Sequence, residues 1–167
     1  MTLADDRLVA KDHADHNARL VREFLLQNNA KNAQFLPLWD GFGDAKTQAQ
    51  ACLQHFADEF DVLLLGMGED GHTASLFPDA PGLAEALNPK AAENIFLVPE
   101  MATRQARISL SLSRLLKSRH IILAFEGQAK QAVLLKALEN GPETELPIRA
   151  ILRHAPVPVE IFRAETN

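Results

Sequence analysis

The residues with the clearest capacity for chemistry are two acids and a histidine set among glycines. Residues 66–72 read Gly-Met-Gly-Glu-Asp-Gly-His. A neutral imidazole accepts a proton near neutral pH, so His72 is a candidate general base. Asp70 stands two residues earlier, where its carboxylate can orient the imidazole or bind substrate hydroxyls. The glycines permit positive φ angles and a close approach of the backbone to a ligand. The segment therefore predicts a site for acid–base chemistry.

A strand and a helix are expected on either side of this loop. Residues 62–65 are apolar, branched and unbroken, which is typical of a strand covered on both faces in a parallel sheet. Residues 73–76 are predicted to begin a helix. Open α/β sheets bind ligands between the carboxyl end of a strand and the amino end of a helix. The loop thus has the position of an active site.

The same glycines also match the dinucleotide-binding pattern Gly-x-Gly-x-x-Gly. That pattern requires a long helix after the third glycine and then a second strand that ends in an acid about 20 residues further on. Pro78, Pro81 and Gly82 interrupt any helix within two turns. The missing context argues against dinucleotide binding.

Residues 66–78, Gly-Met-Gly-Glu-Asp-Gly-His-Thr-Ala-Ser-Leu-Phe-Pro, resemble the signature of bacterial 6-phosphogluconolactonases. That family is similar in fold to glucosamine-6-phosphate deaminases, whose loop keeps Asp-Gly-His but continues Ile-Ala-Phe-Asn-Glu. This chain has Phe77 in place of the deaminase glutamate. The resemblance therefore implies hydrolysis of 6-phospho-D-glucono-1,5-lactone to 6-phospho-D-gluconate in the oxidative pentose phosphate pathway. It implies neither a metal nor another cofactor.

The implied hydrolysis assigns roles to the loop. Water attacks the lactone carbonyl, so His72 would remove a proton from water while Asp70 orients the imidazole or the substrate. Backbone N–H groups of the glycine-rich loop would stabilise the oxyanion, and Gly68 and Gly71 are expected to bind the substrate. Two alternatives stay open: a deaminase or isomerase acting on an amino-sugar phosphate, and a non-catalytic sugar-phosphate-binding protein.

Phosphate recognition requires cations, and the resemblance points to Arg107 and Lys130. It also aligns Arg7 and Asn17 with site residues of the family. Lys130 falls in the first turn of a helix expected over residues 128–139, where a cation opposes the helix dipole, so a bound phosphate would account for its charge. The ordinary alternatives are a solvated lysine and, for Arg107, a salt bridge at the rim.

The pattern of apolar segments predicts an α/β fold in a single domain over residues 1–167. Strands are expected near residues 62, 94, 107, 120, 148 and 159, with helices between several of them. The resemblance implies a Rossmann-like three-layer α/β/α sandwich with a mostly parallel sheet. In that family an N-terminal βα unit with a Ser-Gly-Gly phosphate loop precedes the part matched here, and this sequence contains no Ser-Gly-Gly. We therefore expect the chain alone to be weakly active and to self-associate.

Composition narrows the classes of partner. The chain has 167 residues, of which 47% are hydrophobic and 23% charged, as in an ordinary globular domain. No apolar stretch approaches the roughly 20 residues of a membrane span, and Cys52 is the single cysteine, which fits a cytoplasmic protein. A net charge of −5 argues against nucleic-acid binding. The expected partner is a small phosphorylated sugar lactone, with no nucleic acid and no membrane.

Overall fold

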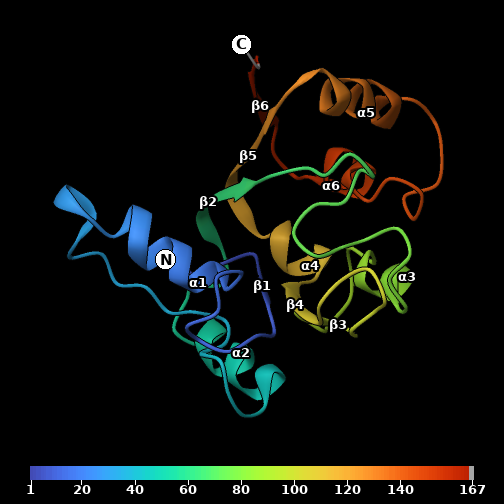
Figure 1. Ribbon diagram of the computed structural model, residues 1–167. Helices are drawn as coiled ribbons and strands as arrows, with labels where there is room; N and C mark the ends of the chain where they lie inside the picture. Colours follow the sequence, from blue (N-terminus) through green and yellow to red (C-terminus); the bar gives the residue numbers. More distant parts are fainter. Residues whose placement is uncertain (166–167) are drawn as a thin grey trace.

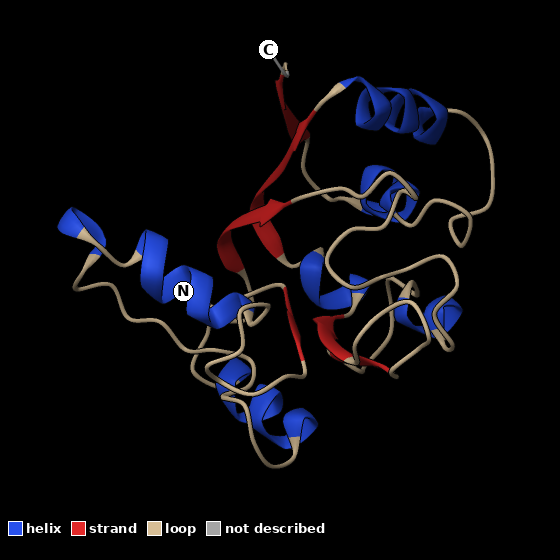
Figure 2. Ribbon diagram, in the orientation of Figure 1, coloured by secondary structure: helices blue, strands red, loops and turns tan. Residues whose placement is uncertain are grey.

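The computed structural model describes residues 1–165 and shows an α/β molecule with two sheets (Figure 1; Figure 2). The strands are β1 (Asp5–Arg7), β2 (Phe60–Leu65), β3 (Ile95–Val98), β4 (Arg107–Leu110), β5 (Ser118–Glu126) and β6 (Val159–Ala164). The helices are α1 (Asn17–Leu20), which continues as a π-helical turn (Val21–Leu25), α2 (Ala45–Leu53), α3 (Leu83–Ala86), α4 (Leu112–Leu115), α5 (Gln128–Leu138) and α6 (Ile148–His154), with a 3-10 turn at Asn28–Ala30. Within residues 1–165, no helix is long and apolar enough to cross a membrane.

The first sheet is parallel and has the order β2-β5-β6. Leu63 lies opposite Ile121 and Leu65 opposite Leu123, and all these side chains are almost fully buried. Helices α5 and α6 pack against each other on one side of this sheet (Figure 1). Because parallel strands end at the same edge, the loop after β2 and the start of α5 after β5 are brought close together.

The second sheet is antiparallel and has the order β1-β4-β3. In the register of β1 with β4, Asp5 lies opposite Ser109 and Arg7 opposite Arg107. Side chains alternate between faces along a strand. Asp5 and Arg7 therefore share one face, while Asp6, which is fully buried, points to the other. The pairing places two arginines from distant parts of the sequence side by side.

The predicted α/β class is confirmed, but the sheets differ from a single, mostly parallel one. One sheet is parallel and the other antiparallel. Strand β2 is also not covered on both faces, because Val62 and Leu64 are 56% and 65% exposed. An unbroken apolar run indicates a strand buried on both faces only where helices cover both faces. Here the run belongs to a strand with one open face.

The strand predicted near residue 148 is wrong, because this segment forms helix α6. Ile148 and Ile151 are both fully buried and form one apolar stripe at helical spacing. Arg149 is buried beside them, and its guanidinium donates to two backbone carbonyl oxygens. A short apolar run fits a strand and a buried helix equally well.

The predicted helix at residues 73–76 is also wrong. Thr73 and Leu76 form an isolated antiparallel bridge, and Ala74 has a φ angle of 48°. The hydroxyl of Thr73 donates to the carbonyl oxygen of Gly66 over 2.8 Å. Hydroxyl side chains compete in this way with helical hydrogen bonding. The segment after the glycines is a closed loop and has no helix dipole of its own.

Helix α6 anchors this loop from the other side. The N–H of Ile148 donates to the carbonyl oxygen of Gly71 over 2.9 Å. Gly71 has a φ angle of 76°, which favours glycine, and a Cβ added there would lie 2.6 Å from Leu146 Cδ2. The segment that was expected to be a strand therefore fixes the position of the candidate active-site loop.

We predict that Gly71→Ala destabilises the protein. The left-handed backbone costs an alanine about 1–2 kcal/mol, and its Cβ would meet both the side chain and the backbone of Leu146. Gly66→Ala is the matched control in the same loop, because the nearest atom to an added Cβ lies 4.0 Å away. Thermal unfolding should show a clear loss of Tm for Gly71→Ala alone. Equal losses in the two variants would contradict the described packing of the loop.

Candidate active site

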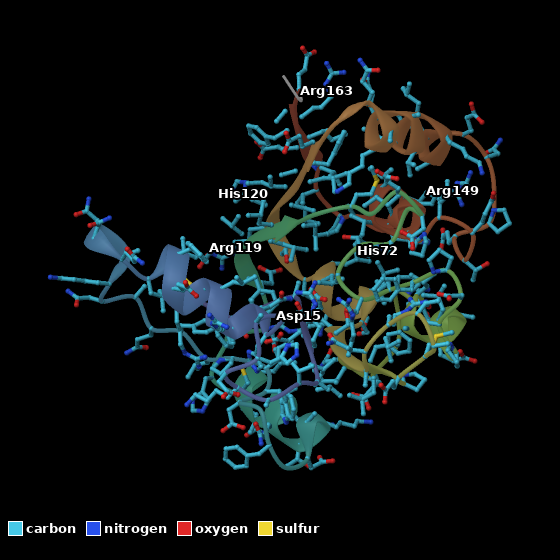
Figure 3. The ribbon with its side chains drawn as sticks, viewed as in Figure 1. Asp15, His72, Arg119, His120, Arg149 and Arg163 are labelled. Atoms are coloured by element: carbon cyan, nitrogen blue, oxygen red, sulfur yellow. The ribbon has the colours of Figure 1, made fainter. Side chains whose placement is uncertain are left out.

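A pocket of about 330 Å³ lies where the carboxyl end of β2 meets the second sheet and the start of α5. Six residues predicted for the site line it: Arg7, Asn17, Gly68, His72, Arg107 and Lys130. They come from β1, α1, the loop after β2, β4 and α5. The remaining two, Asp70 and Gly71, belong to the same loop but do not line the pocket: Asp70 contacts His72, and the carbonyl oxygen of Gly71 accepts a hydrogen bond from Ile148. In Figure 3, His72 lies near the middle of the molecule, whereas His120 lies on the outer face of β5.

His72 is held by Asp70 through two contacts. Imidazole Nδ1 lies 2.5 Å from Oδ1 of Asp70, and the backbone N–H of His72 donates to the same oxygen over 3.1 Å. Burial raises the pKa of Asp70, but the hydrogen bonds from His72 outweigh burial and hold this pKa below its usual value. An ionised carboxylate only accepts hydrogen bonds, so in the neutral imidazole Nδ1 carries the proton and Nε2 is left as the acceptor. This arrangement suits a general base with an orienting carboxylate.

Gly68 leaves the space that this pair occupies. A Cβ at Gly68 would overlap Nδ1 of His72 and lie 2.6 Å from Oδ1 of Asp70. The N–H of Gly68 donates to the carbonyl oxygen of His72 over 2.9 Å, and the N–H of Gly71 donates to that of Gly68 over 3.1 Å. Both amides are engaged within the loop, so neither N–H is free to donate to a substrate oxygen. The glycines shape the loop instead.

Three cationic side chains, Arg7, Arg107 and Lys130, line the pocket, and the part that they line is called the charged wall. Arg7 lies opposite Arg107, and Asp5 Oδ2 is 3.9 Å from Arg107 Nη1, which is too long for a strong ion pair. Burial lowers the pKa of Arg107, and repulsion from Arg7 and Arg104 lowers it further. Lys130 lies in the first turn of α5, where the helix dipole is already positive. An anion bound in the pocket would offset these charges.

Asp6 organises this wall, although the sequence does not single it out. Its buried carboxylate accepts hydrogen bonds from the N–H groups of Arg7, Asn17 and Ala18 at 2.8, 2.6 and 3.1 Å. Burial raises the pKa of Asp6, against these hydrogen bonds and the attraction of His16. The carboxylate thus ties a strand to the start of α1. The role of Asp6 is visible only in its contacts with Asn17 and Ala18. Nothing in the sequence around Asp6 indicates it.

Asp5 is a second residue that sequence reasoning missed. It lines the pocket, and its Oδ2 accepts a hydrogen bond from the hydroxyl of Ser75 over 2.6 Å. Its backbone carbonyl accepts a hydrogen bond from Asn17 Nδ2 over 3.1 Å, while Asn17 Oδ1 accepts one from Arg7 Nη1. Asp5 therefore links the loop after β2 to the side chains on the charged wall.

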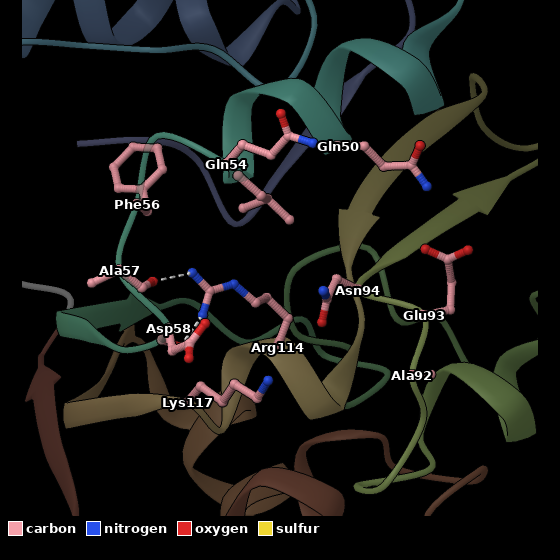
Figure 4. A pocket seen from close by; sticks show the side chains of 11 residues that line it. Gln50, Gln54, Phe56, Ala57, Asp58, Ala92, Glu93, Asn94, Arg114 and Lys117 are labelled. Carbon is pink, nitrogen blue, oxygen red and sulfur yellow. Dashed lines mark hydrogen bonds between the residues drawn. The ribbon is translucent and has the colours of Figure 1, made fainter.

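A larger hollow of about 790 Å³ lies elsewhere, between α2 and α4 (Figure 4). The guanidinium of Arg114, a buried cation that lines this hollow, donates to the backbone carbonyl oxygens of Asp58 and Ala57 at 2.5 and 3.1 Å, so both of its terminal nitrogens already donate to the backbone. No residue predicted for the site lines this hollow. Among residues 1–165, no group of three or more His, Cys, Asp or Glu side chains is placed to hold a metal ion. The smaller pocket is therefore the candidate active site.

The fold and the pocket together define an α/β protein in which cationic side chains and an Asp–His pair meet at one pocket. The family model described as glucosamine-6-phosphate isomerases/6-phosphogluconolactonase matches residues 1–159. The chain belongs to this family. The fold by itself does not separate its members, since a structure of a monomeric glucosamine-6-phosphate deaminase, 16% identical, superposes with a TM-score of 0.75 over 98% of this chain and 71% of that one.

The more similar relatives carry one name. A 6-phosphogluconolactonase of Mesorhizobium japonicum is 42% identical over 167 residues, which cover 98% of this chain and 69% of the relative. The crystal structure of a 6-phosphogluconolactonase from Shewanella baltica is 41% identical, with a TM-score of 0.88 over 99% of this chain and 71% of that one. The chain thus spans about 70% of the length of these relatives.

We predict that Gly68→Ala displaces the His72 imidazole while the fold persists. The added Cβ overlaps the imidazole, which can move aside into the pocket. We therefore expect the variant to lose the Asp70–His72 hydrogen bond while the packing of the loop changes little. That hydrogen bond lowers the pKa of Asp70 against the effect of burial, so its loss should raise this pKa. Titration of the Asp70 carboxyl carbon by NMR measures the change. An unaltered Asp70 pKa in the folded variant would contradict the described geometry.

Proposed function

We propose that this protein hydrolyses 6-phospho-D-glucono-1,5-lactone to 6-phospho-D-gluconate in the oxidative pentose phosphate pathway. The observation that carries the proposal is the sharing of one pocket by an imidazole oriented by Asp70 and three cationic side chains. A lactone that bears a phosphate needs both features, a base for water and positive charge for the phosphate. The names of the similar relatives support the same substrate.

The base removes a proton from the attacking water. Nε2 of His72 accepts this proton, and the imidazolium that forms is stabilised by the ionised carboxylate of Asp70 at Nδ1. As water adds to the carbonyl carbon, negative charge develops on the carbonyl oxygen. The guanidinium group of Arg7 is the nearby charge that we assign to stabilise it. Collapse of the intermediate then breaks the bond to the ring oxygen, which takes up the proton held on Nε2 of the His72 imidazolium.

The phosphate is assigned to the cationic side of the pocket. A phosphate monoester carries close to two negative charges near neutral pH. Lys130 and Arg107 both line the pocket, and the repulsion within the arginine cluster is relieved when an anion binds. Arg107 is not a simple rim salt bridge, because its side chain is only 17% exposed and its contact with Asp5 is long. Asn17 holds Arg7 by a hydrogen bond and so orients it.

A deaminase or isomerase activity is disfavoured by Phe77. This residue stands where the resembling deaminases have a glutamate, and its ring is buried against His72. A phenyl group moves no protons, so the second acid–base group of that chemistry is missing at this position. A non-catalytic protein that binds a sugar phosphate would use the same cations without needing the base, and turnover distinguishes it from an enzyme.

We also propose that residues 1–167 act as one domain, because the pocket takes its walls from both sheets. The three-layer arrangement remains a prediction. Self-association likewise remains a prediction, supported by the exposed apolar side chains of Val62, Leu64 and Phe162 on the first sheet. Sedimentation velocity at several protein concentrations measures it.

We predict that His72→Ala lowers the turnover of the phosphorylated lactone by about two orders of magnitude or more, as expected for the loss of a general base. His55→Ala is the matched control, because this histidine is exposed and outside the pocket. Hydrolysis is followed after subtraction of the spontaneous reaction, and ammonia release from glucosamine 6-phosphate is measured in parallel. Equal turnover in the His72 and His55 variants, or catalytic ammonia release, would overturn the proposal.

A further inference from the structure

The hydrogen bond to Asp70 does not by itself fix the direction of the His72 imidazole. It holds one ring atom, Nδ1, and so it fixes the ring only as firmly as the Asp70 carboxylate is itself held. The Asp70 side chain is also 50% exposed, so packing restrains it little. A general base works only when its acceptor atom is within hydrogen-bond reach of the proton. A second contact must therefore define where Nε2 points.

Phe77 makes this second contact. The ring centroids of Phe77 and His72 are 4.3 Å apart, with an angle of 38° between the ring planes. Rings at this separation are in direct contact. Phe77 is only 6% exposed, so the surrounding core fixes its ring, while the His72 side chain is 30% exposed and faces the pocket. The buried ring thus limits the orientations open to the imidazole.

Arg104 in turn holds Phe77. Its guanidinium carbon lies 4.0 Å from the centroid of the Phe77 ring, a cation–π contact. The same guanidinium pairs with the carboxylate of Asp79, two residues after Phe77 in the chain. The Arg104 side chain is 11% exposed. Arg104 therefore clamps the segment that carries Phe77 to the loop before β4.

We propose that Phe77 is a positioning residue for His72 and that Arg104 holds Phe77 in place. The proposal rests on the lactone hydrolysis assigned above, in which Nε2 must face the pocket. It gives Phe77 a role of its own, beyond the absence of the deaminase glutamate. The ring sets the plane of the imidazole from one side, and the carboxylate of Asp70 fixes Nδ1 from another.

The first test compares Phe77→Leu with Phe60→Leu. Phe60 also has an arginine over its ring, with the guanidinium carbon of Arg114 3.9 Å from the centroid. Its aromatic contact is with Phe56, and it begins β2, at the end of the strand away from the active-site loop. We expect Phe77→Leu to lower kcat by about tenfold or more, since a misplacement of 1 Å can cost about a hundredfold, with KM changed by less than about twofold. Phe60→Leu should leave both constants within about twofold while lowering Tm. Equal effects on kcat would overturn the proposal.

A double-mutant cycle tests the part of Arg104. Arg104→Met removes the cation but keeps an apolar side chain of similar length. If Arg104 acts through the ring, Arg104→Met should lower kcat in the wild type and have no further effect in Phe77→Leu. Losses that multiply in the double variant would show that Arg104 acts independently of Phe77.

An NMR measurement tests the contact without relying on activity. The ring current of Phe77 shifts the imidazole signals of His72, which are identified by their absence in His72→Ala. Phe77→Leu should move these signals, and Phe60→Leu should not. A fall in kcat for Phe77→Leu without this movement overturns the positioning role. If the wild type hydrolyses no lactone, the proposed function fails, while the His72 signals still decide whether Phe77 holds the ring.

Discussion

The hydrogen bond between the carboxylate of Asp70 and the imidazole of His72 is the interaction on which the proposed chemistry depends. It selects the tautomer that leaves Nε2 free, and it lowers the pKa of Asp70 despite burial. The bond exists because the neighbouring positions leave room for it. Gly68 has no side chain to displace the imidazole, and Gly71 turns the chain so that α6 can hold the loop. Helix α6, which does not line the pocket, thus helps to position His72 through its hydrogen bond to the backbone of Gly71.

The second constraint is electrostatic and comes from the other sheet. Pairing of β1 with β4 sets Arg7 opposite Arg107, an arrangement that repels and lowers the pKa of Arg107. The alternation of side chains along β1 separates its two acids: Asp6 turns inward and binds the start of α1, while Asp5 turns toward the pocket. The cations are therefore held by backbone pairing and a buried carboxylate, with little charge to neutralise them. A phosphate is the natural complement of such a wall.

The candidate site was more predictable from the sequence than the fold around it. His72 and Asp70 stand out because their chemistry is encoded in a short spacing, whereas Asp6 works through contacts with a segment eleven residues away that no local pattern reveals. The prediction of Arg107 and Lys130 as phosphate-binding residues depended on the resemblance to a family, because an isolated arginine or lysine gives no distinctive sequence signal. A short apolar run indicates neither which neighbours will cover it nor whether it is a strand or a helix. For this reason β2, expected to be buried on both faces, has one open face, and the segment expected to be a strand near residue 148 is helix α6.

The central claim is that one substrate meets the base and the cations in the same pocket, and a crystal structure with bound 6-phosphogluconate tests it most directly. The account predicts that the carboxylate formed from the lactone lies beside the His72 imidazole. The phosphate should contact Lys130 and Arg107, which line the same pocket. A ligand bound in the larger hollow beside Arg114, or one whose phosphate lies against His72 and away from Lys130, would contradict the account.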